Sequence, residues 1–315
     1  MPGDFTVIAH RGACGYLPEN TLEAFAVGHA MGADFIEMDV VLTADEELVV
    51  LHDLFLESVT DVAQRFPSRR QGDGHFYAID FSLEEIHSLR VHERTQPNGT
   101  AVFPLRFPAS GNIFRVPSLA EVLVLVHGMN QSTGWNSGLY IEPKSPAWHL
   151  NQNQDIVARL LNELSDFGYH SNEDRAVVQS FDATALKRAR EELGCKLTLV
   201  QLTGDNQWAE SDTDFDALLT GQGLAEVSEY ANGIGPWLPQ VVGTNPETGQ
   251  PESIGLVEMA HQHDLFVHAY TLRPEQLPPE AGGLDSFVEF LIREVELDGV
   301  FTDYPDKTIT ARNRM

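Results

Sequence analysis

Residues 34–42, DFIEMDVVL, are the stretch that decides the fold. The run is nearly all apolar, as expected for a strand covered on its faces, yet it contains Glu37 and Asp39. Side chains two residues apart on a strand point the same way. We therefore expect Ile36 and Met38 to pack on helices while both acids point to the opposite side.

Outward from this stretch, short apolar runs alternate with amphipathic segments along most of the chain. Further strands are expected at Thr6–His10, Glu47–Leu51, Leu139–Lys144, Ala176–Ser180, Lys196–Leu202, Leu265–Tyr270 and Gly299–Thr302. Helices are expected at Thr21–Met31, Asp155–Phe167, Ala183–Leu193, Leu218–Ala231, Ser253–His263 and Leu284–Val295. About eight strands, most of them followed by a helix, predict an α/β fold, a closed (β/α)8 TIM barrel. An open, doubly wound sheet is the alternative.

One segment, 54–112, interrupts the alternation. It is rich in Gly and Pro and has one short helical stretch, Ser82–Leu89. We interpret residues 1–315 as a single domain, with 54–112 as an insertion after the third strand that covers the C-terminal face of the barrel.

The charge of the chain limits its partners. Its 315 residues include 47 acidic and 20 basic ones, a net charge of −27. Such a surface repels nucleic acid and anionic membranes, and no apolar run approaches the roughly 18 residues of a membrane span. Lysine is scarce, which fits a saline habitat or simply an acidic protein. A phosphate site on this chain needs local positive charge from a metal, Arg or Lys.

The N-terminus and the cysteines bear on location. Met1–Asp4 leads directly into a predicted strand and lacks the basic and apolar regions of a signal peptide. The chain is then cytoplasmic, or it is the mature form of a periplasmic or secreted protein. Cys14 and Cys195 fall at opposite ends of the predicted sheet, so we expect two free thiols.

Acidic residues gather where predicted strands end, which is the functional face of a parallel barrel. Glu142 repeats the pattern of Glu37 and Asp39, with Lys144 two residues on. Buried carboxylates that point together are costly unless a cation binds them. Hard oxygen ligands favour Ca²⁺ or Mg²⁺ over zinc. A network of ion pairs with Arg11 and Lys144 is the purely structural alternative.

Two histidines, His10 and His52, end strands near these acids. A pair of imidazoles can divide the work of phosphodiester cleavage, one activating the nucleophile and the other protonating the leaving alkoxide. Arg11 and Lys144 supply cations for the phosphate oxygens. His268 shares a strand with Tyr270 two residues on, and the sequence leaves open whether it also faces the site.

Six motifs occur in a characteristic order: residues 10–13 (HRGA), 17–21 (LPENT), 36–40 (IEMDV), 49–53 (VVLHD), 141–144 (IEPK) and 299–305 (GVFTDYP). Together they resemble the glycerophosphodiester phosphodiesterases over nearly the whole chain. Residues 59–63 (VTDVA) and 77–81 (YAIDF) in the insertion look like those of the bacterial periplasmic type.

The resemblance implies a TIM barrel that hydrolyses glycerophosphodiesters, such as glycerophosphocholine and glycerophosphoethanolamine, to sn-glycerol 3-phosphate and an alcohol, with roles in glycerol and lipid metabolism. It implies one divalent cation, Ca²⁺ in the periplasmic type. By position, the roles are His10 and His52 as acid and base, Glu37, Asp39 and Glu142 as metal ligands, Arg11 and Lys144 on phosphate, and Glu19, Gln179, Tyr270 and Phe301 in support. Cys14 and Ala269 depart from the usual pattern outside this set.

Two other functions are considered. A related barrel phospholipase would act on lysophospholipid or sphingomyelin. It would need an apolar rim that faces the membrane, and this acidic sequence does not indicate one. A silent binding protein would be expected to have lost a ligand or a histidine. The sequence leaves open which histidine is the acid, whether water or the glycerol 2-hydroxyl attacks, the head group, and the oligomeric state, for which a homodimer is one alternative.

Overall fold

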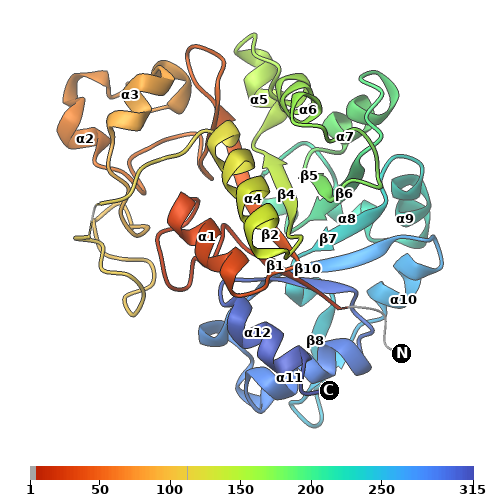
Figure 1. The fold of residues 1–315 in the computed structure, drawn as a ribbon. Coiled ribbons are helices and arrows are strands. Elements are labelled where there is room, and N and C mark those ends of the chain that lie inside the picture. Colours follow the sequence, from red (N-terminus) through yellow and green to blue (C-terminus); the bar gives the residue numbers. More distant parts are fainter. Residues whose placement is uncertain (1–4, 112) are drawn as a thin grey trace.

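The protein is described by a computed structural model that covers residues 5–111 and 113–315 (Figure 1). Eight parallel strands make its central sheet: β1 (Thr6–Ala9), β2 (Phe35–Leu42), β4 (Gly138–Pro143), β5 (Ala176–Ser180), β6 (Thr198–Thr203), β7 (Gly233–Pro236), β10 (Phe266–Leu272) and β11 (Gly299–Thr302). β1 pairs with β11 on one side and with β2 on the other, where Ile8 lies opposite Phe35. This pairing closes the sheet, which confirms the predicted TIM barrel over the open sheet.

The assignment of strands to the barrel was wrong in two places. Residues 47–51 contain β3 (Leu48–Val50), which runs antiparallel to the end of β2 and adds a ninth strand outside the barrel. β2 continues past Val40, its last residue paired with β4, and the chain folds back on this end of β2 in a hairpin. The eighth barrel strand is instead β7, which the apolar pattern missed because its sequence is GIGP. A Cβ on Gly233 would lie 2.5 Å from the Phe266 ring, so close packing requires glycine there.

Helices surround the barrel on its outer side (Figure 1). The six predicted ones are present as α1 (Leu22–Ala30), α6 (Ile156–Asp166), α7 (Ala183–Glu191), α9 (Gly221–Ser228), α10 (Leu256–His261) and α11 (Leu284–Arg293). The described residues outside the insertion contain four more α-helices: α4 (Leu119–Thr133), α5 (Pro146–Asn151), α8 (Phe215–Leu218) and α12 (Pro305–Arg312). Ile36 and Met38 pack in the apolar layer between sheet and helices, as predicted. A smaller cluster, including Ile8, Tyr140 and Phe301, fills the barrel interior.

The insertion has an apolar core of its own. Leu56, Phe76 and Phe81 pack with Val41 and Val49 from the β2–β3 hairpin. Its helices α2 (Val62–Arg65) and α3 (Leu83–Ser88) lie beside the barrel, at the upper left of Figure 1. The hairpin is therefore the platform on which the insertion is built. That the insertion covers the C-terminal face of the barrel stays a prediction.

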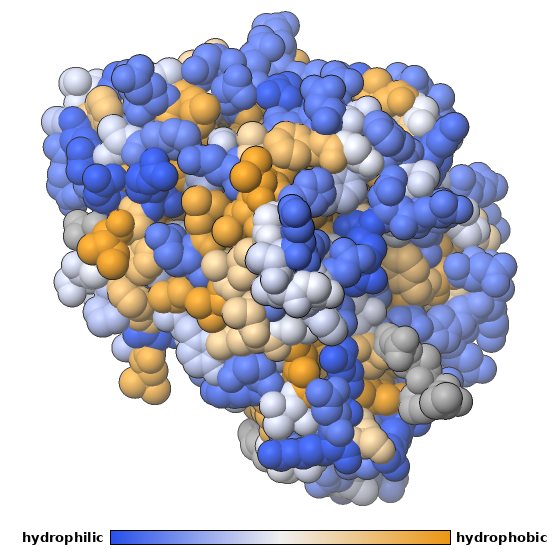
Figure 2. Space-filling view, viewed as in Figure 1, coloured by the Kyte–Doolittle hydropathy of each residue, from blue (hydrophilic) through white to orange (hydrophobic). Residues whose placement is uncertain are grey.

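The surface fits the composition. Figure 2 shows hydrophilic side chains over most of this face, with a broken apolar patch in its left half. Among the described residues, no helix combines the length and apolar character that crossing a membrane requires.

The turn after β1 positions the first motif and depends on glycine. Gly12 has φ +79°, and a Cβ there would lie 2.6 Å from the backbone carbon of Ala24 in α1. Gly12 N–H donates to Ala9 O, and Ala13 N–H donates to Ala24 O. This close approach of loop to helix holds His10 and Arg11 at the barrel mouth.

We predict that Gly12→Ala lowers the free energy of unfolding by about 3 kcal/mol, because it adds backbone strain and a steric overlap. Gly32→Ala is the matched control: Gly32 also has a positive φ, +85°, but a Cβ on it would have no other atom within 4 Å. The control should lose about 1–2 kcal/mol. Denaturant unfolding measures both, and equal losses would contradict the steric argument.

Candidate active site

Three buried carboxylates stand side by side at the C-terminal end of the barrel. Glu37 and Asp39 come from β2 and Glu142 from β4, and Asp39 lies directly opposite Glu142 in the strand register. Their exposed fractions are 2%, 1% and 6%, and one oxygen of each lies within 4.8 Å of the others. The alternation of β2 thus brings the predicted ligands together.

The pKa values of these three acids show that nearby positive charge offsets their negative charge only in part. Burial, and then the neighbouring Asp39, raise the pKa of Glu37 well above its ordinary value. Burial also raises the pKa of Glu142 to about 7, although Lys144 opposes this. Burial acts on Asp39 in the same direction, but Arg11 and other cations outweigh it and hold its pKa at about 2. A cation bound here would remove the repulsion.

Two side chains bring positive charge to the cluster. The Arg11 Nε lies 3.3 Å from Asp39 Oδ2, and its Nη1 donates to Glu19 Oε1 at 2.9 Å. The Arg11 backbone N–H donates to Glu37 Oε2 at 2.7 Å. Lys144 Nζ donates to Glu142 Oε1 at 2.6 Å. The ion-pair network considered from the sequence therefore exists, but Arg11 and Lys144 bring two positive charges to three carboxylates, and Arg11 also pairs with Glu19. The residues fit a hard divalent cation as well.

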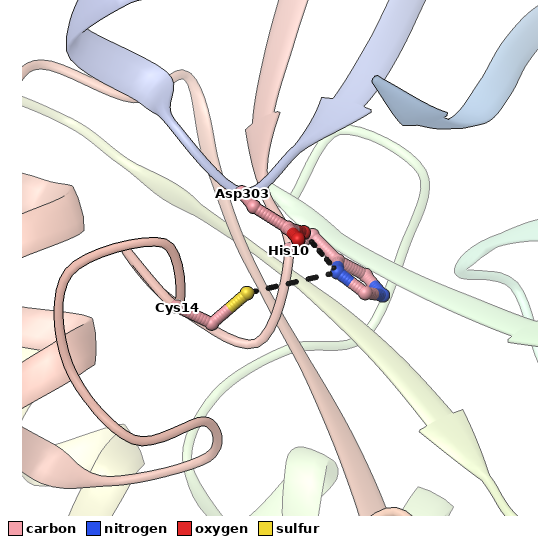
Figure 3. Close-up of side chains that lie close together, drawn as sticks. All are labelled: His10, Cys14 and Asp303. Atoms are coloured by element: carbon pink, nitrogen blue, oxygen red, sulfur yellow. Dashed lines mark hydrogen bonds and ion pairs between the residues drawn. The ribbon is translucent and has the colours of Figure 1, made fainter. Parts of the chain in front are cut away.

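His10 is anchored from behind by an acid. Its Nδ1 lies 2.7 Å from Asp303 Oδ1 (Figure 3). The other carboxylate oxygen, Oδ2, accepts hydrogen bonds from Arg106 Nη2 and Arg273 Nε, both at 2.6 Å. Burial and Arg11 lower the pKa of His10, although Asp303 opposes them. A neutral imidazole with Nδ1–H directed at Asp303 presents the lone pair of Nε2 to the cavity.

His52 is held in the same way. Its Nδ1 lies 2.6 Å from Asp53 Oδ1, while Asp53 Oδ2 accepts from Ser58 Oγ at 2.6 Å and Arg94 Nη1 at 2.7 Å. Burial, with Arg11 and then Lys144, lowers the pKa of His52 to about 4. The site thus holds two imidazoles, each fixed by a carboxylate that is itself paired with arginine.

Cys14 lies beside the first of these units. Its Sγ is 3.9 Å from His10 Nδ1, and the thiol is free, as is that of Cys195. Burial raises the pKa of the Cys14 thiol well above its usual range. The sulfur, the imidazole and Asp303 lie close enough to bind a metal, but the two arginines on Asp303 oppose a second cation there. The prediction of free thiols is confirmed.

The residues predicted to play supporting roles occupy different places. Gln179 Nε2 donates to Glu37 Oε1 at 3.2 Å, so it contacts a carboxylate of the candidate metal site. Tyr270 and Phe301 line the cavity. His268 lies deeper in the barrel, where its Nδ1 is 3.3 Å from the Tyr140 hydroxyl, and it is not among the described residues that line the cavity.

Sequence reasoning missed the partners that hold the histidines. Arg94 and Arg106 belong to the insertion, and Arg94 also donates to both carboxylate oxygens of Glu19, at 2.7 and 2.9 Å. Neither arginine lies in a periodic pattern or at a spacing that links it to the site. Asp303 and Asp53 were recognised only as acids in motifs, although their positions at strand ends could have suggested these pairings.

One continuous cavity of about 740 Å³ joins these groups. His10, Arg11, His52, Lys144 and the three carboxylates line it, so the structure brings together every residue predicted for catalysis, metal binding and phosphate contact. Glu19 binds Arg11 and is not among the described residues that line the cavity. Two imidazoles, a cluster of acids and two cations in one cavity could together carry out metal-assisted phosphodiester cleavage.

Comparison with known proteins agrees with this geometry. The model of the glycerophosphoryl diester phosphodiesterase family matches residues 10–307. The chain belongs to this family. It is therefore a phosphodiesterase, as the order of its motifs predicted.

Individual relatives extend the match to almost the full chain. A glycerophosphodiester phosphodiesterase of Haemophilus influenzae is 37% identical over 97% of this chain and 89% of its own length, and one of Treponema pallidum is 33% identical over 95% and 89%. The solved structure of a family protein from Silicibacter pomeroyi, at 27% identity, covers 100% of this chain and 95% of that one with a TM-score of 0.73. An Oleispira antarctica phosphodiesterase shares the fold at 19% identity and a TM-score of 0.68, covering 98% and 96%; it was solved in complex with the product sn-glycerol-3-phosphate.

A buried acid beside this site leads to a prediction on stability. Glu93 is 4% exposed, and its Oε2 has no hydrogen-bond partner. Burial, and then Glu19, raise the pKa of Glu93 to about 8, from 4.5 for an exposed carboxyl. Its contribution to stability is therefore complete below about pH 4.5, declines as pH rises, and is gone above about pH 8.

We expect Glu93→Gln, which mimics the protonated acid, to match the wild type at about pH 4.5 and to exceed its free energy of unfolding at about pH 9 by about 2–4 kcal/mol. Denaturant unfolding at both values tests this. Parallel pH dependence in the two proteins would show that Glu93 is charged throughout.

Proposed function

We propose that this phosphodiesterase hydrolyses glycerophosphodiesters to sn-glycerol 3-phosphate and an alcohol. The observation that carries the proposal is the placement of His10 and His52, each bound through Nδ1 to a buried acid, around one cavity with the three-carboxylate cluster. The product found in the fold neighbour from Oleispira antarctica supports the same reaction.

In this proposal Glu37, Asp39 and Glu142 hold one divalent cation, Ca²⁺ with Mg²⁺ as the alternative. Their oxygens are hard donors and their charge is uncompensated by Arg11 and Lys144. When bound, the cation supplies Lewis-acid stabilisation of the charge on the phosphate oxygens.

Arg11 and Lys144 bind the phosphate of the substrate. Arg11 Nη1 and Nε face Glu19 and Asp39, which orients the guanidinium at the cavity, while Nη2 makes no hydrogen bond within the described part of the chain. The Lys144 ammonium gives one of its three donors to Glu142 and keeps two for an anion. Both charges stand where negative charge develops during transfer.

The histidines handle the protons. One imidazole accepts a proton from the attacking hydroxyl or water through Nε2, and the other donates one to the leaving alkoxide. Asp303 and Asp53 stabilise each ring when it becomes an imidazolium, and they fix the tautomer that leaves Nε2 free.

The insertion 54–112 supports this arrangement. Arg94 joins Asp53 to Glu19, and Arg106 binds Asp303, so the insertion holds the acids behind both histidines. We propose that it thereby fixes the geometry of the C-terminal face that it covers.

A coupled assay for sn-glycerol 3-phosphate tests the reaction. We expect release from glycerophosphocholine, loss of activity on chelation, and recovery with Ca²⁺ or Mg²⁺. Choline release from sphingomyelin or lysophospholipid without glycerol phosphate would instead show a phospholipase, and no turnover of either substrate would leave a binding protein.

The metal site has a test of its own. By calorimetry, Glu37→Gln should weaken cation binding at least ~10-fold, whereas exposed Glu289→Gln should not.

Loss of either imidazole should stop proton transfer while leaving the metal site intact. We predict that His10→Ala and His52→Ala each reduce turnover at least ~10²-fold with unchanged cation affinity. His170→Ala, an exposed histidine on the outer surface, is the control. Near-normal turnover in either active-site variant would remove that residue from the mechanism.

A further inference from the structure

The cavity extends beyond the residues that the proposed reaction uses. Its outer part is lined by Trp208 and Glu210, from the loop after β6, and by Trp237, which directly follows β7. We call these three residues the outer pocket. No step of the proposed reaction needs them.

The two indoles of the outer pocket pack against each other and remain open to the cavity. Their ring centroids are 5.0 Å apart at an interplanar angle of 66°. Trp208 is 42% exposed and Trp237 37%. Two large aromatic rings left this exposed inside a cavity form a surface that a ligand can cover.

The Trp208 ring packs on the backbone of its own loop, and the Trp237 backbone is fixed by a hydrogen bond. A Cβ on Gly204 would lie 2.5 Å from the Trp208 ring, so glycine lets the indole lie directly on the chain. The Gln240 side chain ties the two loops together: its Nε2 donates to Gly204 O at 2.8 Å, and its Oε1 accepts from Trp237 N–H at 3.0 Å. The outer pocket is therefore preorganised, which lowers the entropic cost of binding.

An aromatic path connects the outer pocket to the phosphate cations. Lys144 Nζ lies 5.6 Å from the centre of the Phe181 ring, and that ring is 6.0 Å from Tyr270. The Tyr270 hydroxyl donates to Thr203 O, one residue before Gly204. A substituent of the bound phosphate that follows this wall leads to the two indoles.

Charge identifies the kind of group that fits. In the part of the chain that the structure describes, Glu210 has no hydrogen bond or ion pair. Its side chain lines the same cavity as Lys144 and the two indoles. An unpaired carboxylate beside two indole faces attracts a cation, and the aromatic faces favour an alkylammonium in particular. A neutral sugar would leave the Glu210 carboxylate without a partner of opposite charge.

We propose that Trp208, Trp237 and Glu210 form a subsite for an ammonium head group on the alcohol side of the substrate. This inference rests on the proposed function and assigns the specificity within it: the enzyme prefers glycerophosphodiesters of cationic amino alcohols, such as choline, over those of uncharged alcohols.

The test compares kcat/KM for glycerophosphocholine and for glycerophosphoglycerol, which share the phosphate and one glycerol and differ in the charge of the alcohol. The wild type should prefer the cationic substrate. Trp208→Leu, Trp237→Leu and Glu210→Gln should each lose about three- to thirtyfold on that substrate alone. Trp208→Phe, which keeps an aromatic face, should lose less than Trp208→Leu. Glu229→Gln, an exposed acid after α9, is the charge control and should change neither value.

Two results would overturn the subsite: a wild type without preference, or variants that lose equally on both substrates, since the outer pocket would then hold a part that both share. If neither substrate is hydrolysed, the proposed function fails, and binding still decides the inference. Choline alone should then shift the NMR signals of the Trp208 and Trp237 indole N–H groups in the wild type and less in Glu210→Gln. Absence of that shift, or an equal shift with glycerol, would reject it.

Discussion

Repulsion among Glu37, Asp39 and Glu142 is the constraint on which the rest of the site depends. Three carboxylates with almost no access to water cannot all be ionised without nearby positive charge. Arg11 and Lys144 supply part of it, and the raised pKa values of Glu37 and Glu142 show what remains uncompensated. The same deficit that makes the cluster costly in isolation makes it suitable for a divalent cation.

The barrel supplies the geometry that makes this cluster possible. Parallel pairing of β2 with β4 places Asp39 beside Glu142, and closure between β1 and β2 brings the first motif to the same edge. The turn at Gly12 then lets the Arg11 backbone N–H reach Glu37. Backbone hydrogen bonding thus places the charges, and long flexible side chains contribute little to their position.

The two imidazoles of the site are held by a second layer of ion pairs. His10 follows β1 and His52 follows β3, yet each has an acid at Nδ1 and an arginine behind that acid. Two of those arginines, Arg94 and Arg106, come from the insertion. A chain with so large a negative charge thus places several of its 20 basic residues near the cavity.

The sequence by itself determined the barrel and the inner residues of the site. Strand periodicity shows that Glu37 and Asp39 point together, and parallel strands end at one face, so residue spacing is enough to group the acids with His10, Arg11 and Lys144. His52 was grouped with them on the same rule, although β3 runs antiparallel and reaches the site by pairing with the end of β2. These are local rules that need no knowledge of distant contacts. The structure agrees with that grouping, while the catalytic roles remain proposals.

Only the tertiary structure decided what depends on contacts between distant segments. β7 was missed because a strand of Gly-Ile-Gly-Pro is defined by the bulky neighbours that it accommodates, and β3 was misplaced because direction along a sheet is not encoded in apolar pattern. The pairing of Arg106 with Asp303 spans 197 residues, and the two indoles of the outer pocket come from separate loops. Such pairings depend on how the closed barrel brings its loops together, and residue spacing along the chain does not predict them.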